Sequence, residues 1–165
     1  MHLPESVIPI LRETVSSPVL PLGLPLEIWK APDHRTWVDA FLELGVSLSH
    51  SDLSEEGLPR GYILVAHIFH WEAACQSEAW HAFDNESSSV ARVIACYREV
   101  GLHGEADALS RAFGMWQSSD GDSTLTSKAY NALSHSYSVD FDRMEYLACY
   151  FVDNAQQLFY LPSAT

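Results

Sequence analysis

The stretch that decides the fold class runs Ser87-Ser88-Ser89-Val90-Ala91-Arg92-Val93-Ile94-Ala95-Cys96-Tyr97-Arg98-Glu99-Val100-Gly101. Its apolar residues recur at intervals of three and four, which is the spacing of one face of an α-helix. These residues are Val90, Val93, Ile94, Tyr97 and Val100. The serines supply an N-cap, and the final glycine is placed to stop the helix. The segment therefore predicts an amphipathic helix with a defined beginning and end.

The same spacing continues on both sides of this stretch. Upstream, Asp33 can cap a helix that ends at Gly45 and whose apolar face is Trp37, Phe41, Leu42 and Leu44. We expect further helices over residues 62–83, 105–117, 125–137 and 140–162, the last burying a face that begins at Phe141. No segment alternates at the period of a β-strand, so we predict an all-α, single-domain bundle of five or six helices over residues 33–165.

Residues 1–32 differ from the rest because prolines interrupt any long helix. These prolines stand at positions 4, 9, 18, 21, 25 and 32. A short helix over residues 5–15 is compatible with this spacing, and residues 18–25 read as an extended apolar segment. We interpret residues 1–32 as a Pro-rich N-terminal arm packed on the core; an arm exchanged within a dimer is the alternative.

The chain is strongly acidic, with 22 Asp and Glu against 9 Lys and Arg and a formal net charge of -13 in 165 residues. Its hydrophobic fraction of 47% is that of a folded globule, so the acids must lie on the surface of a packed body. Such a surface repels nucleic acid and anionic membranes and attracts basic proteins. The charge therefore indicates the kind of partner without naming a reaction.

Two stretches concentrate this charge because they contain no Lys or Arg at all: residues 36–59 and residues 61–91. We expect their carboxylates to form a face that docks on a basic partner, with an aromatic side chain as the buried anchor. The predicted contacting residues are Asp39, Glu43, Asp52, Glu55, Glu56, Glu72, Glu78, Asp84, Glu86 and Trp80. Tyr97 and Trp116 are further candidates for the anchor.

A metal site is the main alternative. His67 and His70 stand three residues apart in an expected helix, so they could share one helical face. Zinc would need two further ligands from another helix, and no second His/Glu cluster at helical spacing supplies them. No phosphate-binding loop, nucleophile elbow or dinucleotide-binding turn is present. We expect no cofactor, and a small metal-dependent helical enzyme that uses His67 and His70 is the alternative function.

The three cysteines, Cys75, Cys96 and Cys149, fit reduced thiols in a cytoplasmic protein. The first residues show no basic segment followed by an apolar run, so we expect no signal peptide. The longest apolar stretch, residues 62–69, is far below the roughly 20 residues that span a bilayer. We therefore expect a cytoplasmic protein that does not enter the membrane.

Residues 60–160 resemble the C-terminal domain family of bacterial DNA-mimic proteins. The likeness begins at Glu72, which precedes a segment in which Phe83 and Asn85 match the family's motif. The family's paired glycines are replaced by Ser77 and Glu78. The helices that follow in that family are similar to residues 93–101, 105–113 and 146–154.

This resemblance implies an all-helical, dimeric, non-enzymatic protein whose acids stand in for DNA phosphates. Acidic single-domain chains of this kind also look like immunity proteins, which neutralise a toxin by covering its active site. We therefore predict an acidic inhibitor that binds a basic protein, either an antibacterial toxin or a nucleic-acid-binding protein. A structural subunit whose charge only keeps it soluble is a third reading.

Overall fold

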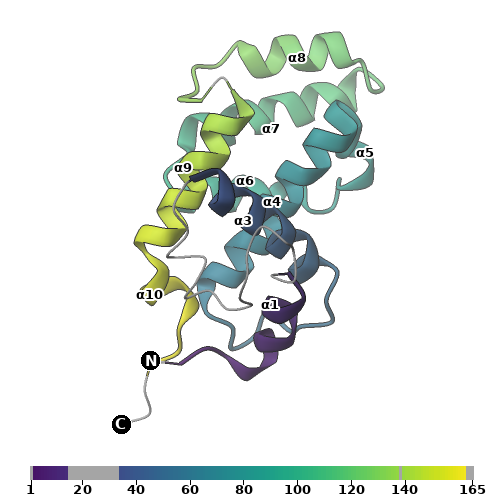
Figure 1. Ribbon diagram of the computed structural model, residues 1–165. Coiled ribbons are helices and arrows are strands. Elements are labelled where there is room, and N and C mark those ends of the chain that lie inside the picture. Colours follow the sequence, from purple (N-terminus) through teal and green to yellow (C-terminus); the bar gives the residue numbers. More distant parts are fainter. Residues whose placement is uncertain (1, 15–33, 138, 163–165) are drawn as a thin grey trace. The chain divides into compact units, whose positions relative to one another are not determined.

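The computed structural model describes residues 2–14, 34–137 and 139–162 (Figure 1). Most of these residues lie in helices, and their only β-type pairing is an isolated antiparallel bridge between His2 and Leu161. The predicted all-α fold is confirmed. The elements are η1 (Glu5–Val7), α1 (Ile8–Thr14), α3 (His34–Ser49), α4 (Arg60–Glu78), η2 (Ala79–His81), α5 (Ala82–Asn85), α6 (Val90–Glu99), α7 (His103–Ser118), α8 (Ser123–Asn131), α9 (Asp140–Asp153) and α10 (Ala155–Phe159).

The short N-terminal helix expected over residues 5–15 corresponds to η1 and α1. The extended segment expected over residues 18–25 lies outside the described residues. Every helix of the described ranges is too short or too polar to cross a membrane.

The chain forms two compact units. The first comprises residues 1–70 and 144–165, and the second comprises Trp71–Arg143. The chain passes from one unit to the other inside two helices, because α4 begins in the first unit and α9 begins in the second. The helical domain expected over residues 33–165 is thus distributed over both units.

Aromatic rings form the core of the first unit. Phe41 of α3 contacts Phe69 of α4 and Phe151 of α9, with ring centroids 5.4 Å apart in both pairs. Tyr62 packs edge-on against Phe159 of α10 at 5.2 Å. All five side chains are at most 1% exposed, and burying one Phe side chain contributes roughly 1.5–3 kcal/mol. The apolar face of α3 therefore joins segments that are far apart in the sequence.

The expected helix stop at Gly45 is wrong, because α3 continues to Ser49. Gly45 instead allows α3 and α4 to approach closely, since a Cβ atom there would lie 2.6 Å from the Cβ of Phe69. Gly61 does the same at the start of α4, where a Cβ would lie 2.6 Å from the carbonyl oxygen of Leu158. Both glycines serve helix packing in the first unit.

In the second unit, α6 begins directly after the three serines, as the pattern predicts, but the expected serine N-cap is wrong, because the Ser89 side chain makes no capping bond and its hydroxyl donates to Glu86 instead. The helix is terminated by Gly101 in the left-handed conformation, with φ of +88°. The amide of Leu102 donates to the carbonyl oxygen of Tyr97 at 2.8 Å, and that of Gly101 donates to Arg98 at 3.2 Å. These two bonds form the Schellman motif expected for a glycine stop.

The long helix expected over residues 62–83 is broken, because α4 ends at Glu78. Ala79 adopts a positive φ of 52°, which is unfavourable for a residue with a Cβ atom. Just before the break, the Ser77 hydroxyl donates to the carbonyl oxygens of Ala73 at 3.2 Å and Ala74 at 3.1 Å. Such side-chain bonds compete with the helical ladder. The chain then continues as η2 and α5.

The last expected helix is interrupted at Asn154, between α9 and α10. The backbone of Asn154 leaves helical values, with φ of -106° and ψ of 16°, and its side-chain amide donates to the Tyr150 carbonyl at 2.8 Å. The expected burial of Phe141 is wrong, because this side chain is 40% exposed in the first turn of α9. These interruptions yield more and shorter helical pieces than the periodicity alone indicates.

The helix expected over residues 125–137 begins earlier and ends earlier, at Ser123 and Asn131. Its start is set by Asp122, whose Oδ1 accepts from the backbone amide of Leu125 at 2.9 Å. This is an N-cap bond, which satisfies an amide that the helix itself leaves without a partner.

Candidate functional site

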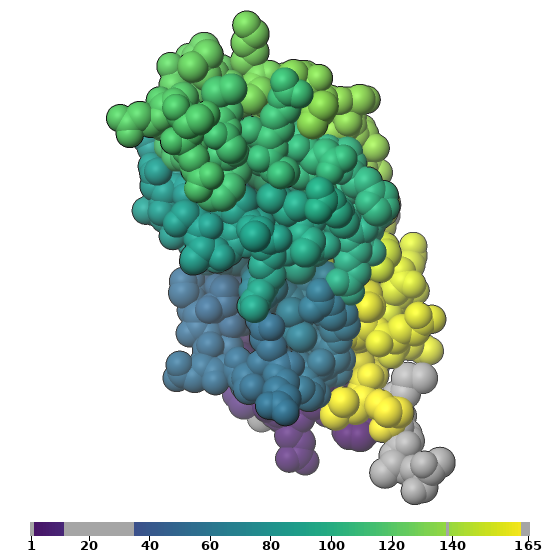
Figure 2. Space-filling model, turned by 180° about the vertical axis from the view of Figure 1, so that it is seen from behind, coloured from purple at the N-terminus to yellow at the C-terminus, as the bar shows by residue number. Residues whose placement is uncertain are grey.

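Five of the predicted contacting acids lie in the first unit, and all five are exposed. They are Asp39 and Glu43 on α3, and Asp52, Glu55 and Glu56 in the loop between α3 and α4. This part of the chain is blue in Figure 2, where it lies at the surface. Asp39 and Glu43 are one helical turn apart, so they lie on the same side of α3.

Most of these carboxylates have no ion-pair partner among the residues that the structure describes. Within the described ranges, Asp39, Glu43, Asp52 and Glu56 form no ion pair. Arg35, one turn before Asp39, is exposed and makes no ion pair with it. Glu55 differs from the other four, because its Oε1 contacts Nε2 of His67 at 3.0 Å. Four of the five carboxylates therefore lie exposed to solvent without an ion pair in the described part of the chain.

Three further predicted acids make contacts inside the second unit. Asp84 is exposed, and its Oδ1 accepts from Nε1 of Trp116 at 2.8 Å. Glu78 is half-buried and accepts from the side-chain amide of Asn85 at 2.6 Å. Glu86 is also half-buried and accepts from a neighbouring serine hydroxyl at 3.3 Å. The predicted contacting set is thus divided between the two units.

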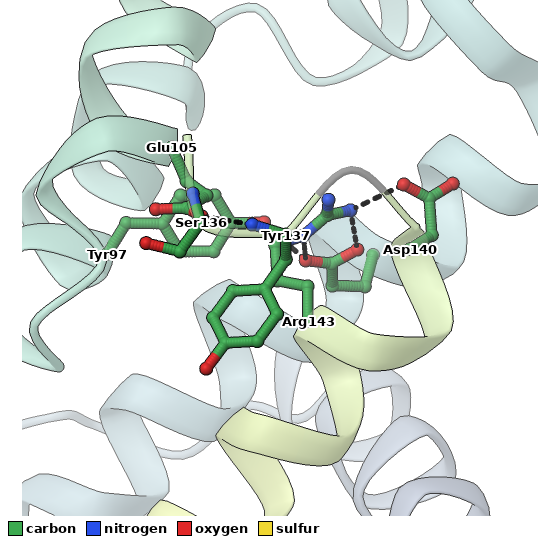
Figure 3. A network of polar contacts seen from close by, with 7 residues as sticks. Tyr97, Glu105, Ser136, Tyr137, Asp140 and Arg143 are labelled. Carbon is green, nitrogen blue, oxygen red and sulfur yellow. Dashed lines mark hydrogen bonds and ion pairs between the residues drawn. The ribbon is translucent and has the colours of Figure 1, made fainter. Parts of the chain in front are cut away.

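The prediction that Glu72 contacts a partner is wrong, because its side chain is only 1% exposed. Arg143 of α9 donates from Nε to Glu72 Oε1 and from Nη2 to Glu72 Oε2, both at 2.7 Å. The Tyr97 hydroxyl also donates to Glu72 Oε1. Arg143 Nη2 makes one further bond, to Asp140 Oδ1 at 3.0 Å (Figure 3). Both oxygens of Glu72 are therefore used inside the protein.

Sequence reasoning missed this pair because the two residues are distant in the chain and no spacing rule connects them. The available signal was the position of Glu72 on α4. Its neighbours Ile68, Phe69 and Trp71 are all buried, at 3% exposure or less. A carboxylate on such a face requires a buried partner.

The electrostatics of this network fix its protonation. Burial raises the pKa of the Tyr97 hydroxyl well above its ordinary value, and the negative charge of Glu72 raises it further. Burial alone would lower the pKa of the Arg143 guanidinium, but Tyr97 and Glu72 raise it above its ordinary value. At physiological pH, Tyr97 is therefore a neutral donor and Arg143 is a cation.

A second buried carboxylate holds the segment before α9. Glu105 of α7 is 1% exposed, and its Oε1 accepts from the backbone amides of Ser136 at 2.7 Å and Tyr137 at 3.0 Å (Figure 3). Its Oε2 is buried and has no partner among the described residues. Glu105 thus organises a turn where the sequence pattern had predicted more of α8.

The second unit also contains a cavity of about 300 Å³ beside the Glu72–Arg143 pair. Four aromatic side chains line it: Trp71, Trp80, Tyr97 and Tyr130. Asp140 and Arg143 line it as well. Trp80, the predicted anchor, is half-buried, and its ring contacts that of Tyr130 with centroids 5.7 Å apart. This volume is at the lower end for small-ligand sites.

The two histidines of the metal hypothesis make contacts inside the first unit. In addition to the contact of His67 with Glu55, Nδ1 of His70 lies 3.0 Å from the Ser49 hydroxyl. The ring of His70 packs edge-on against that of His50, with centroids 5.3 Å apart. In the part of the chain that the structure describes, no group of three or more His, Cys, Asp or Glu side chains could hold a metal ion.

Comparisons with protein-family models, curated proteins and solved structures find no match for this chain. The likeness to DNA-mimic and immunity proteins therefore rests on the sequence alone and stays a prediction. The two features that stand out in the structure are the exposed carboxylates of the first unit and the aromatic cavity of the second.

Proposed function

We propose that this chain is a non-enzymatic inhibitor that binds a basic protein through the exposed carboxylates of α3 and the loop that follows it. The observation that carries the proposal is a set of four exposed acids without ion pairs in the described ranges: Asp39, Glu43, Asp52 and Glu56. We call this set the acidic face. Glu55 adjoins it and contacts His67.

The acidic face does not help the chain to fold. Like charges one helical turn apart, such as Asp39 and Glu43, destabilise a helix by about 0.2–0.5 kcal/mol. Unbalanced charge of one sign also adds repulsion within the compact state. A partner rich in Lys and Arg relieves this repulsion when it docks, and it is attracted from a distance before contact.

The partner is a protein whose own surface is built to neutralise phosphates or otherwise carries excess positive charge. A nucleic-acid-binding protein has such a surface, and carboxylates that occupy it block access of the nucleic acid. A basic toxin is neutralised in the same way when its active site is covered. The three free cysteines fit a cytoplasmic setting for this encounter.

The test compares two variants of the full chain with equal charge. The face variant carries Asp39→Asn, Glu43→Gln, Asp52→Asn and Glu56→Gln. The control variant neutralises four exposed acids elsewhere: Glu5→Gln, Asp120→Asn, Asp142→Asn and Asp153→Asn. Each variant removes four negative charges, which changes the formal net charge from -13 to -9. Any difference in partner binding between the two variants therefore depends on where the neutralised acids lie and not on the total charge.

Wild type and both variants are immobilised and incubated with extract of the native host, and retained proteins are identified by mass spectrometry. We expect a basic protein that wild type and the control variant retain and that the face variant loses. The same protein, once purified, should lose its nucleic-acid binding or its toxic activity when wild type is added. Equal retention by the face and control variants would refute the acidic face as the binding surface.

A further inference from the structure

The aromatic cavity of the second unit has walls suited to a cation. The faces of aromatic rings carry negative charge density, and a cation within about 6 Å of a ring centroid is attracted to it. Trp80 and Tyr130 are both half-buried on the cavity wall, with their ring planes inclined by 59°. Trp71 and Tyr97, which are both nearly buried, also line the cavity.

Asp140 and Arg143 are the charged side chains that line the cavity, and the Glu72 carboxylate lies next to it, bonded to Arg143. Glu72 and Asp140 contribute two negative charges, and Arg143 contributes one positive charge that is hydrogen-bonded to both of them. The Asp140 side chain is 67% exposed, and only its Oδ1 is bonded within the described residues. Its Oδ2 is therefore available to accept a hydrogen bond from a bound cation.

The side chain of Cys75 also lines the cavity, and the pKa of its thiol is sensitive to these charges. Burial raises the pKa of Cys75, and the negative charge of Glu72 raises it further. Asp140 and Glu78 act in the same direction, and Arg143 alone opposes them. The carboxylates thus outweigh the guanidinium at this wall of the cavity.

We propose that this cavity binds an arginine side chain presented by the basic partner. A guanidinium is planar, so it can stack on Trp80 or Tyr130 while it donates to Asp140, and it is more weakly hydrated than the ammonium of lysine. Ala79 and Leu109, which also line the cavity, offer apolar surface to the alkyl stem. This proposal rests on the proposed function, because the basic partner supplies the arginine.

Short peptides test this site without the partner. The probes are Ac-Gly-Arg-Gly-NH2, the same peptide with lysine, and the same peptide with citrulline, which keeps the shape of arginine and removes its charge. The full chain is labelled with 15N at tryptophan, and the indole N–H resonances of Trp71 and Trp80 are followed by NMR. We expect chemical shift changes that saturate with the arginine peptide. The citrulline peptide should bind at least about fivefold more weakly.

Two variants locate the binding. Asp140→Asn should weaken binding of the arginine peptide several-fold, whereas Asp142→Asn, which neutralises an exposed acid in the same helical turn, should not. Trp80→Leu should abolish the shift of the Trp71 resonance, with circular dichroism as the check on folding. Equal affinity for arginine and citrulline peptides would overturn the proposal, and so would Asp140→Asn binding as tightly as wild type.

The two proposals can fail separately. The peptide titration leaves the acidic face unchanged, so non-saturating shifts with every peptide would remove the arginine site and leave the inhibitor proposal standing. Conversely, the face variant keeps the cavity intact. The opposite result is also possible: the full chain binds the arginine peptide saturably, and the face variant still retains the partner. That result would refute the acidic face as the binding surface and leave the cavity site standing.

Discussion

Neutralising Glu72 should destabilise the protein far more than neutralising any exposed acid. Glu72→Gln preserves the shape of the side chain and removes its charge. Arg143 is only 7% exposed, and the substitution leaves it with one anionic partner among the described residues, the largely exposed Asp140. Removing one member of a buried ion pair typically costs 3–5 kcal/mol, because the other charge is left uncompensated.

An exposed ion pair provides the comparison for this loss of folding stability. Arg98 and Asp107 form a salt bridge at 2.8 Å with side chains that are 50% and 60% exposed. Asp107→Asn should therefore cost only about 0–1 kcal/mol. Urea unfolding followed by tryptophan fluorescence and by circular dichroism measures both losses, and the slopes against urea should stay similar. A Glu72→Gln loss below about 1 kcal/mol would refute the reasoning.

A double-mutant cycle separates the pair from simple loss of packing. Arg143→Met alone leaves the Glu72 carboxylate buried with the Tyr97 hydroxyl as its hydrogen-bond donor. Glu72→Gln combined with Arg143→Met removes both charges and keeps an acceptor for that hydroxyl. The combined loss should fall short of the sum of the single losses by about 2 kcal/mol or more. Additive losses would show that the two charges are not coupled.

Three further predictions follow from single positions. Ala79→Gly should stabilise the protein by roughly 0.5–1 kcal/mol because φ there is positive. Ala95→Gly in the middle of α6 should instead cost about 1 kcal/mol. Thermal unfolding should show a higher melting temperature for the first variant and a lower one for the second. Asp122→Ala should cost about 1 kcal/mol through loss of the N-cap bond, measured in urea. Above the ordinary tyrosine pKa of about 10, the unfolded chain releases the Tyr97 proton and the folded chain keeps it, so stability should fall with rising pH by up to about 1.4 kcal/mol per unit. In Tyr97→Phe this decline between pH 10 and 12 should be shallower.

Helices whose signals are local could be predicted from the sequence. The apolar spacing of α6 and the glycine at its end act within a few residues, and the structure shows both. Exposure of Asp39, Glu43 and the acids of the following loop was also predictable, because carboxylates are almost never buried unless another group pairs with them.

Features that depend on contacts between distant segments were not predictable. Gly45 has the same chemistry whether it stops a helix or admits a neighbouring one, and only the approach of Phe69 decides between the two. The break at Ala79 carries no Pro or Gly to announce it. Glu72 read as one more surface acid, since its partner Arg143 lies in another helix far along the chain. The aromatic cavity likewise gathers residues from α4, η2, α6, α7, α8 and α9.

The salt dependence of partner affinity tests the central claim most directly. The dissociation constant of the retained basic protein is measured for wild type, the face variant and the control variant at increasing sodium chloride. Four exposed charge pairs at about 0.2–1 kcal/mol each sum to roughly 1–4 kcal/mol, so the face variant should bind about fivefold or more weakly at low salt and show a flatter salt dependence. If instead the face variant matches the control variant in both affinity and slope, carboxylates on α3 and its following loop do not hold the partner.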